Sequence, residues 1–454
     1  MRLTRFEVTN FKNFRRTVVL GGMVGFDVIH GENNVGKSNL LQAIDLFFLL
    51  VGSIGKRSEK LSDAPGEDET SAAPLIEDER QVGVRFHVKQ QALEQRGFSP
   101  DAIFNFSEPL PIELVGEIEV LETDLQRAGL KHPSQPSLLF LRFRVMRSHN
   151  GCVDVEVRMD SGEFNQEIWA GLRLLVILLS TNFTVQSNVR AHAFILVDVF
   201  RRVPWVDGNE DVTSLRRTVT DALLLGLYDA KESVEPGVFL RWELFERAMN
   251  SLGSVIGDGR FVITYNRRSM RAILAVQRGS LRIPIETMGS GVQQIAALVA
   301  RVLLAGAAVV AVEEPELNLR YDMQLRLRDM LRDIVASGAG PKQILVTSHS
   351  PAFEADTHFY GMRLTDEGPV VERRPTAESA AWLQLGTVSA PMRGGAWGYV
   401  SSDGLLRLPD EIRAELGVKQ GGGVVVLKRA QQPYVEVLSN EQFLGLIHGG
   451  QSEG

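Results

Sequence analysis

The residues best suited to chemistry form a short glycine-rich stretch near the start of the chain. Every fixed position of the pattern G-x-x-x-x-G-K-(S/T) is filled, by Gly31, Gly36, Lys37 and Ser38. Apolar residues at 25–30 predict a buried strand before this stretch, and residues 39–44 predict the start of an amphipathic helix after it. A strand that turns through glycines into a helix directs its backbone N–H groups at one anion. This context favours a phosphate-binding loop over a chance glycine-rich turn.

The loop predicts ATP and Mg²⁺ as ligands. Lys37 would reach the β- and γ-phosphates, and the Ser38 hydroxyl would hold Mg²⁺. The turn before it, with Lys12 and Asn13, is locally basic; it is either a solvated face or a neighbour of the nucleotide. The loop residues expected at the nucleotide are Gly31, Asn33, Asn34, Gly36, Lys37, Ser38 and Asn39.

A second candidate element is an apolar run, residues 307–312, that ends in two carboxylates. Buried carboxylates are costly unless they meet a cation or a proton donor. Glu313 would orient Mg²⁺ through water, and Glu314 would polarise the water that attacks the γ-phosphate. The alternative is a strand that ends in surface acids, but this run is too apolar for an edge strand.

Two further segments bear polar groups suited to phosphate. Ser290 and Gly291 begin a helix after a tight turn, which makes a second anion site that a facing second chain could use. The alternative there is an ordinary N-capped helix. His349 follows the apolar strand 343–347 and would sense the γ-phosphate. A lone histidine after a strand is usually structural, but its place behind the loop and the acidic strand favours the sensor.

The elements that must position these residues are predicted from hydrophobic periodicity. Four alternating segments predict an antiparallel sheet: 81–88, 112–121, 138–146 and 152–158. Helical patterns occupy 166–179, 214–228 and 239–252, with a strand at 193–197 and a hairpin from 261–265 and 271–276. Residues 295–312 predict a buried helix and then a buried strand. The polar stretch 51–80 predicts a loop.

In chain order, the four motifs are the phosphate loop, the turn at Ser290 and Gly291, the acidic strand and His349, and together they resemble the ABC-type ATPase heads of the SMC, RecF and OLD proteins. The E-E-P-E-L form of the acidic segment and the N-N-V-G-K-S loop look most like OLD-type ATPases. The resemblance implies an α/β P-loop NTPase fold over residues 1–374, with a mixed sheet and with inserted strands and a helical lobe at about 90–260. It also implies a dimer, in which Ser290 and Gly291 of one chain complete the site of the other.

The sequence departs from this family at several positions. Glu313 replaces the usual aspartate, and Asn318 and Arg320 stand where a histidine and a proline often follow. Gln186 is the only suggestion for the family's glutamine-loop residue. No carboxylate set for a metal-dependent nuclease follows His349, so no nuclease centre is expected.

The C-terminal part predicts a small separate unit. A linker at 375–395 leads to residues 396–446, which are similar to the AbrB/MazE/SpoVT swapped-hairpin domain, a small β-rich unit. That resemblance implies dimerisation, and many members bind DNA. Arg407 and Arg413 are the candidate DNA contacts, although the five basic side chains of the segment face four acidic ones.

Composition narrows the class of protein. With 49 Lys+Arg, 56 Asp+Glu and a net charge of −7, the chain is no general polyanion binder, and any nucleic-acid contact must come from a local basic patch. A single cysteine, Cys152, excludes an internal disulfide. The start shows no signal-peptide pattern and no stretch predicts a membrane span, so we expect a cytoplasmic protein.

The sequence therefore predicts an ATP-binding, slowly hydrolysing ATPase that forms a homodimer or higher homo-oligomer around nucleotide. The resemblance implies nucleic-acid maintenance or phage defence with a separate effector protein. Two alternatives stay open: a DNA-binding regulator that reads through its AbrB-like tail, and a scaffold that binds ATP without hydrolysing it.

Overall fold

The computed structural model describes most of the N-terminal three quarters of the chain and short pieces beyond it. The described residues are 1–60, 74–78, 81–94, 96–104, 110–121, 137–148, 153–160, 193–198, 212–253, 257–268, 270–354, 358–366, 368–375, 399–400, 406–407, 416–417, 424–427, 436–439 and 442. The chain divides into two compact units, Met1–Arg374 and Pro375–Gly454.

The first unit contains a seven-stranded antiparallel sheet in the order β2-β1-β6-β7-β8-β5-β4. Its strands alternate apolar and polar residues, which is the pattern of a sheet with one buried face. The strands are β1 (Arg2–Thr9), β2 (Val18–Gly21), β4 (Pro74–Asp78), β5 (Gln81–Val88), β6 (Ile112–Val120), β7 (Ser137–Arg147) and β8 (Val153–Asp160).

A second, six-stranded sheet has the order β16-β15-β3-β14-β13-β9. The pairs from β15 to β9 are parallel. Every residue of β3 and β14 is buried, as expected for strands that are covered on both faces. The strands are β3 (Phe26–Gly31), β9 (Phe194–Asp198), β13 (Val309–Glu313), β14 (Gln343–Ser348), β15 (His358–Thr365) and β16 (Gly368–Pro375).

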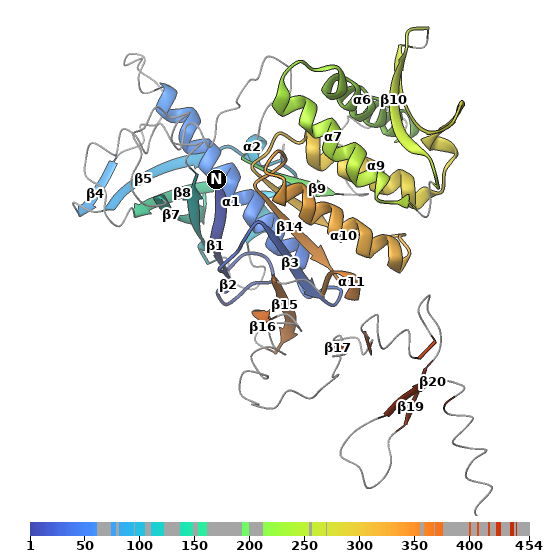
Figure 1. The fold of residues 1–454 in the computed structure, drawn as a ribbon. Coiled ribbons are helices and arrows are strands. Elements are labelled where there is room, and N and C mark those ends of the chain that lie inside the picture. The colour runs from blue at the N-terminus through green and yellow to red at the C-terminus, as the bar shows by residue number, and fades with distance from the viewer. Residues whose placement is uncertain are drawn as a thin grey trace, which may run out of the picture. The chain divides into compact units, whose positions relative to one another are not determined.

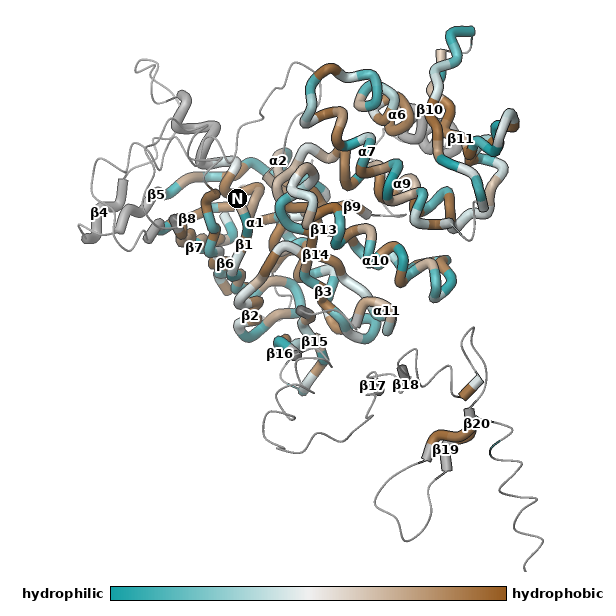
Figure 2. The backbone as a smooth tube through the Cα atoms, in the orientation of Figure 1, coloured by the Kyte–Doolittle hydropathy of each residue, from teal (hydrophilic) through white to brown (hydrophobic). Residues whose placement is uncertain are grey.

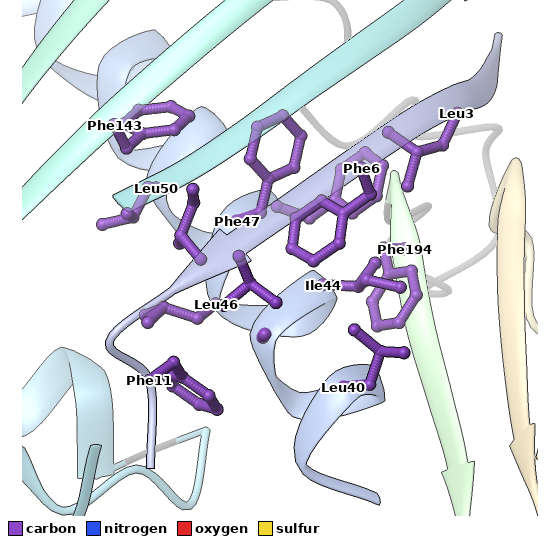
Figure 3. Close-up of a cluster of buried hydrophobic side chains, with 14 of the residues drawn as sticks. Leu3, Phe6, Phe11, Leu40, Ile44, Leu46, Phe47, Leu50, Phe143 and Phe194 are labelled. Carbon is purple, nitrogen blue, oxygen red and sulfur yellow. The ribbon is translucent and has the colours of Figure 1, made fainter. Parts of the chain in front are cut away.

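Helix α1 (Lys37–Lys60) lies between the two sheets. Its side chains share one apolar core with the inner face of the antiparallel sheet and one face of the parallel sheet. Phe47 packs edge-to-face against Phe6 of β1 and Phe143 of β7, with ring centroids 5.8 and 5.4 Å apart (Figure 3). This packing holds the middle of α1 against the antiparallel sheet.

The opposite face of the parallel sheet is covered by helices, which form a second core with it (Figure 1). Against these helices packs a three-stranded antiparallel sheet in the order β10-β11-β12. The elements are α6 (Val212–Glu232), α7 (Pro236–Asn250), α9 (Ser290–Leu304), α10 (Tyr321–Ala336), β10 (Arg260–Asn266), β11 (Arg271–Arg278) and β12 (Leu281–Pro284). The brown apolar stretches of α7 and α9 alternate with teal polar ones in Figure 2, as in amphipathic helices.

Short elements complete the described chain. In the first unit they are α2 (Gln90–Glu94), α3 (Pro100–Ile103), η1 (Ile285–Thr287) and α11 (Pro351–Glu354). In the second unit β17 (Tyr399–Val400) pairs with β18 (Leu406–Arg407), and β19 (Val424–Leu427) pairs with β20 (Glu436–Ser439). Among the described residues, no helix is both long and apolar enough to cross a membrane.

The predicted strands, hairpin and helices that fall on described residues of the first unit are confirmed, with ends that move by a few residues. The predicted loop at 51–80 is wrong at both ends, because α1 continues to Lys60 and β4 occupies Pro74–Asp78. Leu50 and Val51 are buried, so packing carries the helix past Gly52, where the local sequence favours a break. The predicted helix at 166–179 lies outside the described residues.

Candidate nucleotide-binding site

The phosphate-binding pattern occupies the turn between β3 and α1, as the strand–loop–helix context predicts. Asn34 and Gly36 have positive φ angles of 65° and 106°. A side chain at Gly31 would place its Cβ 2.5 Å from the carbonyl oxygen of Met362, so that position admits only glycine. The loop is thus shaped by backbone geometry, with its N–H groups ahead of the helix N-terminus.

Lys37 is buried, and its ammonium group bonds the loop itself. The Nζ atom donates to the carbonyl oxygens of Gly31 and Glu32, both at 2.7 Å. Burial lowers the pKa of Lys37, and the carboxylates of Glu314, Glu316 and Glu313 oppose that shift. The three glutamates therefore form the negative surroundings of the lysine.

The turn before β2 contacts the loop. The side-chain oxygen of Asn13 accepts a hydrogen bond from Asn39 Nδ2 at 2.8 Å. A Cβ built on Gly36 would lie only 2.7 Å from Asn13 Nδ2. The structure thus places Asn13 beside the phosphate loop, and its contact with a bound nucleotide stays a prediction. Lys12 bonds Gln42 on the first turns of α1 instead.

The acidic strand β13 ends next to the loop. Ser38 Oγ donates a hydrogen bond to Glu313 Oε1. A hydroxyl and a carboxylate suit Mg²⁺, which in nucleotide sites takes one or two protein carboxylates and the substrate phosphates. No cluster of three or more His, Cys, Asp or Glu side chains suited to a metal occurs among the described residues. Ser38 and Glu313 therefore fit the role of metal ligands.

Glu314 stands at the point where β13 turns. Its φ angle is 44°, which is uncommon for a residue with a side chain, and its N–H donates to the Thr347 carbonyl at 2.9 Å. The carboxylate lies 4.0 Å from His349 Nδ1 and its side chain is 19% exposed. The general-base candidate and the γ-phosphate sensor candidate are thus neighbours at the same edge of the sheet.

Glu316 is a functional candidate that the sequence reasoning did not single out. Its side chain is 2% exposed, and Oε1 accepts hydrogen bonds from Ser348 Oγ at 2.7 Å and from the His349 N–H at 2.8 Å. His349 Nδ1 lies 3.2 Å from the same oxygen, whereas the buried Oε2 has no hydrogen-bond partner. A buried carboxylate therefore fixes the orientation of His349. The signal in the sequence was a third acid directly after an apolar strand.

The structure does not join the Ser290 turn to the phosphate loop. Ser290 begins α9, its side chain is exposed, and no hydrogen bond links it or Gly291 to residues 31–38 in the described part of the chain. Gln294, one turn later, donates to the Leu317 carbonyl at 2.6 Å. Within one chain, Ser290 is therefore separate from the lysine.

The remaining candidates are placed by backbone alone or not at all. Arg407 lies in β18, where it pairs with Tyr399. Arg413 and Gln186 lie outside the described residues. The strand β9 ends at Asp198, which pairs in register with Glu313 and so brings one more acidic residue to this edge of the sheet.

Strand, phosphate loop and helix, with the acidic strand and His349 at the same sheet edge, define an α/β P-loop NTPase fold. Residues 242–353 match the family model of the AAA ATPase domain. That segment includes Ser290, Glu313, Glu314 and His349 and begins after the phosphate loop. The match supports an ATP-binding ATPase domain of the AAA kind, as the motifs predict. The OLD-like subtype and the AbrB-like tail stay predictions.

One curated relative is the chromosome partition protein Smc of Synechocystis sp., which is 41% identical over 59 residues. These residues are 13% of this chain and 5% of that protein, so the chain matches a small part of the relative's length.

Solved structures of SMC heads show a distant likeness. An SMC head bound to the C-winged helix domain of ScpA has a TM-score of 0.47 at 17% identity, over 84% of this chain and 100% of that chain. The SMC head domain from Thermotoga maritima has a TM-score of 0.43 at 12% identity, over 83% and 100%. An SMC head with an extended coiled coil, bound to the C-terminal domain of ScpA from Pyrococcus furiosus, has a TM-score of 0.44 at 14% identity, over 84% and 98%.

Proposed function

We propose that this protein binds ATP with Mg²⁺ and hydrolyses it. The observation that carries the proposal is the meeting of three motifs at one edge of the parallel sheet. Lys37 and Ser38 begin α1 there, Ser38 bonds Glu313, and Glu314 lies beside His349. These are the parts that phosphoryl transfer to water requires: a cation for the phosphates, metal ligands and a group that orients the water.

Each side chain then has a defined task. Lys37 balances charge on the β- and γ-phosphates. Mg²⁺ held by Ser38 and Glu313 would neutralise further phosphate charge. Glu314 accepts a proton from the attacking water. The oxygen of that water bonds the γ-phosphorus while the bond between the γ-phosphorus and the bridging oxygen breaks. His349, oriented by Glu316 at Nδ1, would turn its other ring nitrogen toward the departing phosphate.

The change Glu314→Gln tests the hydrolytic role. The amide keeps the size of the side chain but cannot take the proton, so turnover falls by roughly two orders of magnitude or more while ATP affinity stays within about threefold. Phosphate release and nucleotide titration measure the two quantities. Glu243→Gln on the exposed face of α7 is the matched control. A Glu314→Gln protein with wild-type turnover would refute the assignment, and wild-type protein that binds ATP without releasing phosphate would favour the scaffold.

We also propose that two chains close around the nucleotide. The exposed Ser290, apart from its own phosphate loop, supports a role in the site of a second copy. With ATP, the Glu314→Gln protein is then expected to sediment as a dimer. Ser290→Arg places a bulky cation at that contact, so it should abolish the dimer while a single chain still binds ATP. If Ser290→Arg dimerises like the parent, the facing arrangement is wrong.

The cellular setting is proposed from the motif resemblance alone. OLD-like features suggest nucleic-acid maintenance or phage defence, with an effector on another chain. Co-purification with the product of the neighbouring gene, with and without ATP, tests whether an effector joins.

A further inference from the structure

The small sheet formed by β10, β11 and β12 differs in charge from the rest of the chain. Residues 259–285 contain no Asp, Glu or Lys, although the whole chain has a net charge of −7. All six charged side chains in this segment are exposed arginines. They are Arg260, Arg267, Arg268, Arg271, Arg278 and Arg282. We call this set the arginine surface.

The strand register places several of these arginines on one face. Arg260 pairs with Gln277, and Gln277 pairs with Arg282, so one polar row crosses all three strands. At the far end of the hairpin Asn266 pairs with Arg271. Phe261, Ile263 and Leu274 occupy the alternate positions and are buried in the core with α6 and α7. The row therefore faces away from the helices.

The arginine surface has two ends. Arg267, Arg268 and Arg271 gather at the turn between β10 and β11, the hydrophilic tip beside the β10 label in Figure 2. Arg260 and Arg282 lie together at the other end, and Arg278 lies beside them, one position after Gln277 and therefore on the alternate face of β11. Six residues of strand separate the ends, or roughly 20 Å at about 3.3 Å per residue.

This spacing and chemistry fit a polymer of phosphates. A nucleic-acid strand presents a phosphate about every 3.4 Å along a duplex axis, so it can meet both ends of the surface at once. Arginine without lysine favours bidentate phosphate contacts and stacking on bases. Between the ends lie uncharged residues, among them the half-buried pair Thr264 and Ile273. The nearest acids in sequence, Asp258 and Glu286, stand just outside the segment.

We propose that the arginine surface binds the backbone of a nucleic acid. The site lies in the ATPase unit and does not depend on Arg407 or Arg413. It goes beyond the proposed ATP hydrolysis, and either proposal can fail while the other holds.

Full-length protein is titrated into fluorescently labelled single strands and duplexes of about 30 nucleotides and mixed sequence, at about 50 to 200 mM salt. Two double variants each take two arginines from one end: Arg267→Gln with Arg268→Gln, and Arg260→Gln with Arg282→Gln. The control, Arg85→Gln with Arg363→Gln, removes the same charge from exposed positions that pair with Glu156 and Glu372. A fourth variant combines Arg407→Gln and Arg413→Gln.

Each surface variant should weaken binding about tenfold at about 100 mM salt and lower the salt slope by about 1 to 2, with the control unchanged. ATP turnover without nucleic acid should stay at the wild-type level in all of them. The proposal is overturned if the surface variants bind like the control, if only the tail variant weakens binding, or if wild-type protein binds no strand even at about 50 mM salt. The last result would favour an acidic protein partner.

Discussion

At the scale of single residues, the least expected group is Glu316. It lies under His349 with one oxygen fully engaged, so it controls which way the imidazole points. In a hydrolytic site this orientation matters only when the histidine reads the γ-phosphate. Glu316 is thus a positioning residue for the proposed sensor, and it touches no substrate itself.

The change Glu316→Gln should separate binding from turnover. The amide oxygen can still accept from Ser348 and the His349 N–H, but the negative charge that attracts His349 Nδ1 is gone. We expect kcat to fall about tenfold, the value of one charge-assisted hydrogen bond, with ATP affinity within about threefold. Steady-state phosphate release and nucleotide titration measure both.

Ser348→Ala is the matched control, because it removes another donor to the same Oε1 and leaves the contact to His349. It should cost clearly less in kcat. Equal losses in the two variants would show that Glu316 acts by holding the strand end together. Glu316→Asp keeps the charge but should also have a reduced kcat, since its shorter side chain cannot reach His349 Nδ1.

The sequence predicts the positions of site residues best where a motif has a fixed spacing. The pattern around Gly31 and Lys37 specifies a loop by itself, and Glu313 follows from a buried strand that ends in acid. Glu316 was not predicted, because its role depends on a strand 32 positions away in sequence, as its bond to Ser348 shows. Contacts of that kind depend on the order of strands in the sheet, which periodicity does not determine.

At the scale of elements, the contact between α1 and β6 sets the position of the phosphate loop. Gly116 of β6 faces the ring of Phe47, and a Cβ built there would lie 2.2 Å from Phe47 Cζ. The ring also contacts Phe6 and Phe143, so it has little freedom to move away (Figure 3). The absence of one side chain thus allows helix and sheet to approach.

Gly116→Ala should therefore destabilise the protein by about 1 to 3 kcal/mol, the usual cost of overpacking a core. Gly237→Ala in α7 is the opposite case, because a Cβ there meets nothing within 4 Å. That change should stabilise by about 0.4 to 1 kcal/mol through the unfolded chain. Thermal unfolding of both variants tests the pair, and a Gly116→Ala protein as stable as the wild type would show that α1 shifts freely.

Elements with strong periodicity were predicted well, and their arrangement was not. Alternation identified β5 to β8, since one face of that sheet is buried. The pairing of β9 with β13 joins segments more than a hundred residues apart, as Phe194 opposite Val309 shows. No local pattern encodes such a neighbour. The continuation of α1 past Val51 was missed for a related reason, because the core that buries Val51 includes residues far away in the sequence.

At the scale of the whole molecule, one buried acid ties stability to pH. Asp27 of β3 is fully buried; its Oδ2 accepts from the Val24 N–H at 2.8 Å, and its Oδ1 has no hydrogen-bond partner. Burial raises the pKa of Asp27 to about 7, although the hydrogen bond from Val24, the neighbouring Gln343 side chain and the charges of Arg373 and Arg2 oppose the shift.

Between about pH 4 and pH 7 the folded protein keeps a proton on Asp27 that the unfolded chain has released. That proton contributes on the order of 4 kcal/mol to the free energy of unfolding below pH 4. This contribution is lost as the pH rises toward 7. Asp27→Asn removes the titration. The variant should gain in thermal midpoint over the wild type between pH 5 and pH 8.

Asp333→Asn, an exposed change of the same charge, is the control and should follow the wild-type pH profile. If the thermal midpoints of Asp27→Asn and the wild type differ by the same amount at pH 5 and at pH 8, Asp27 is ionised in the folded protein over that whole range.

The two bonds from the Lys37 ammonium to Gly31 and Glu32 have a consequence for ligand choice. A ligand that enters this loop meets an ammonium group with two of its three N–H donors engaged, and to use those two it must displace acceptors already in place. Its net gain is the difference between phosphate oxygens and peptide oxygens, so a nucleoside or monophosphate gains little from the swap. The bonds from Lys37 to the loop carbonyls therefore favour ligands with several phosphates over those with one or none.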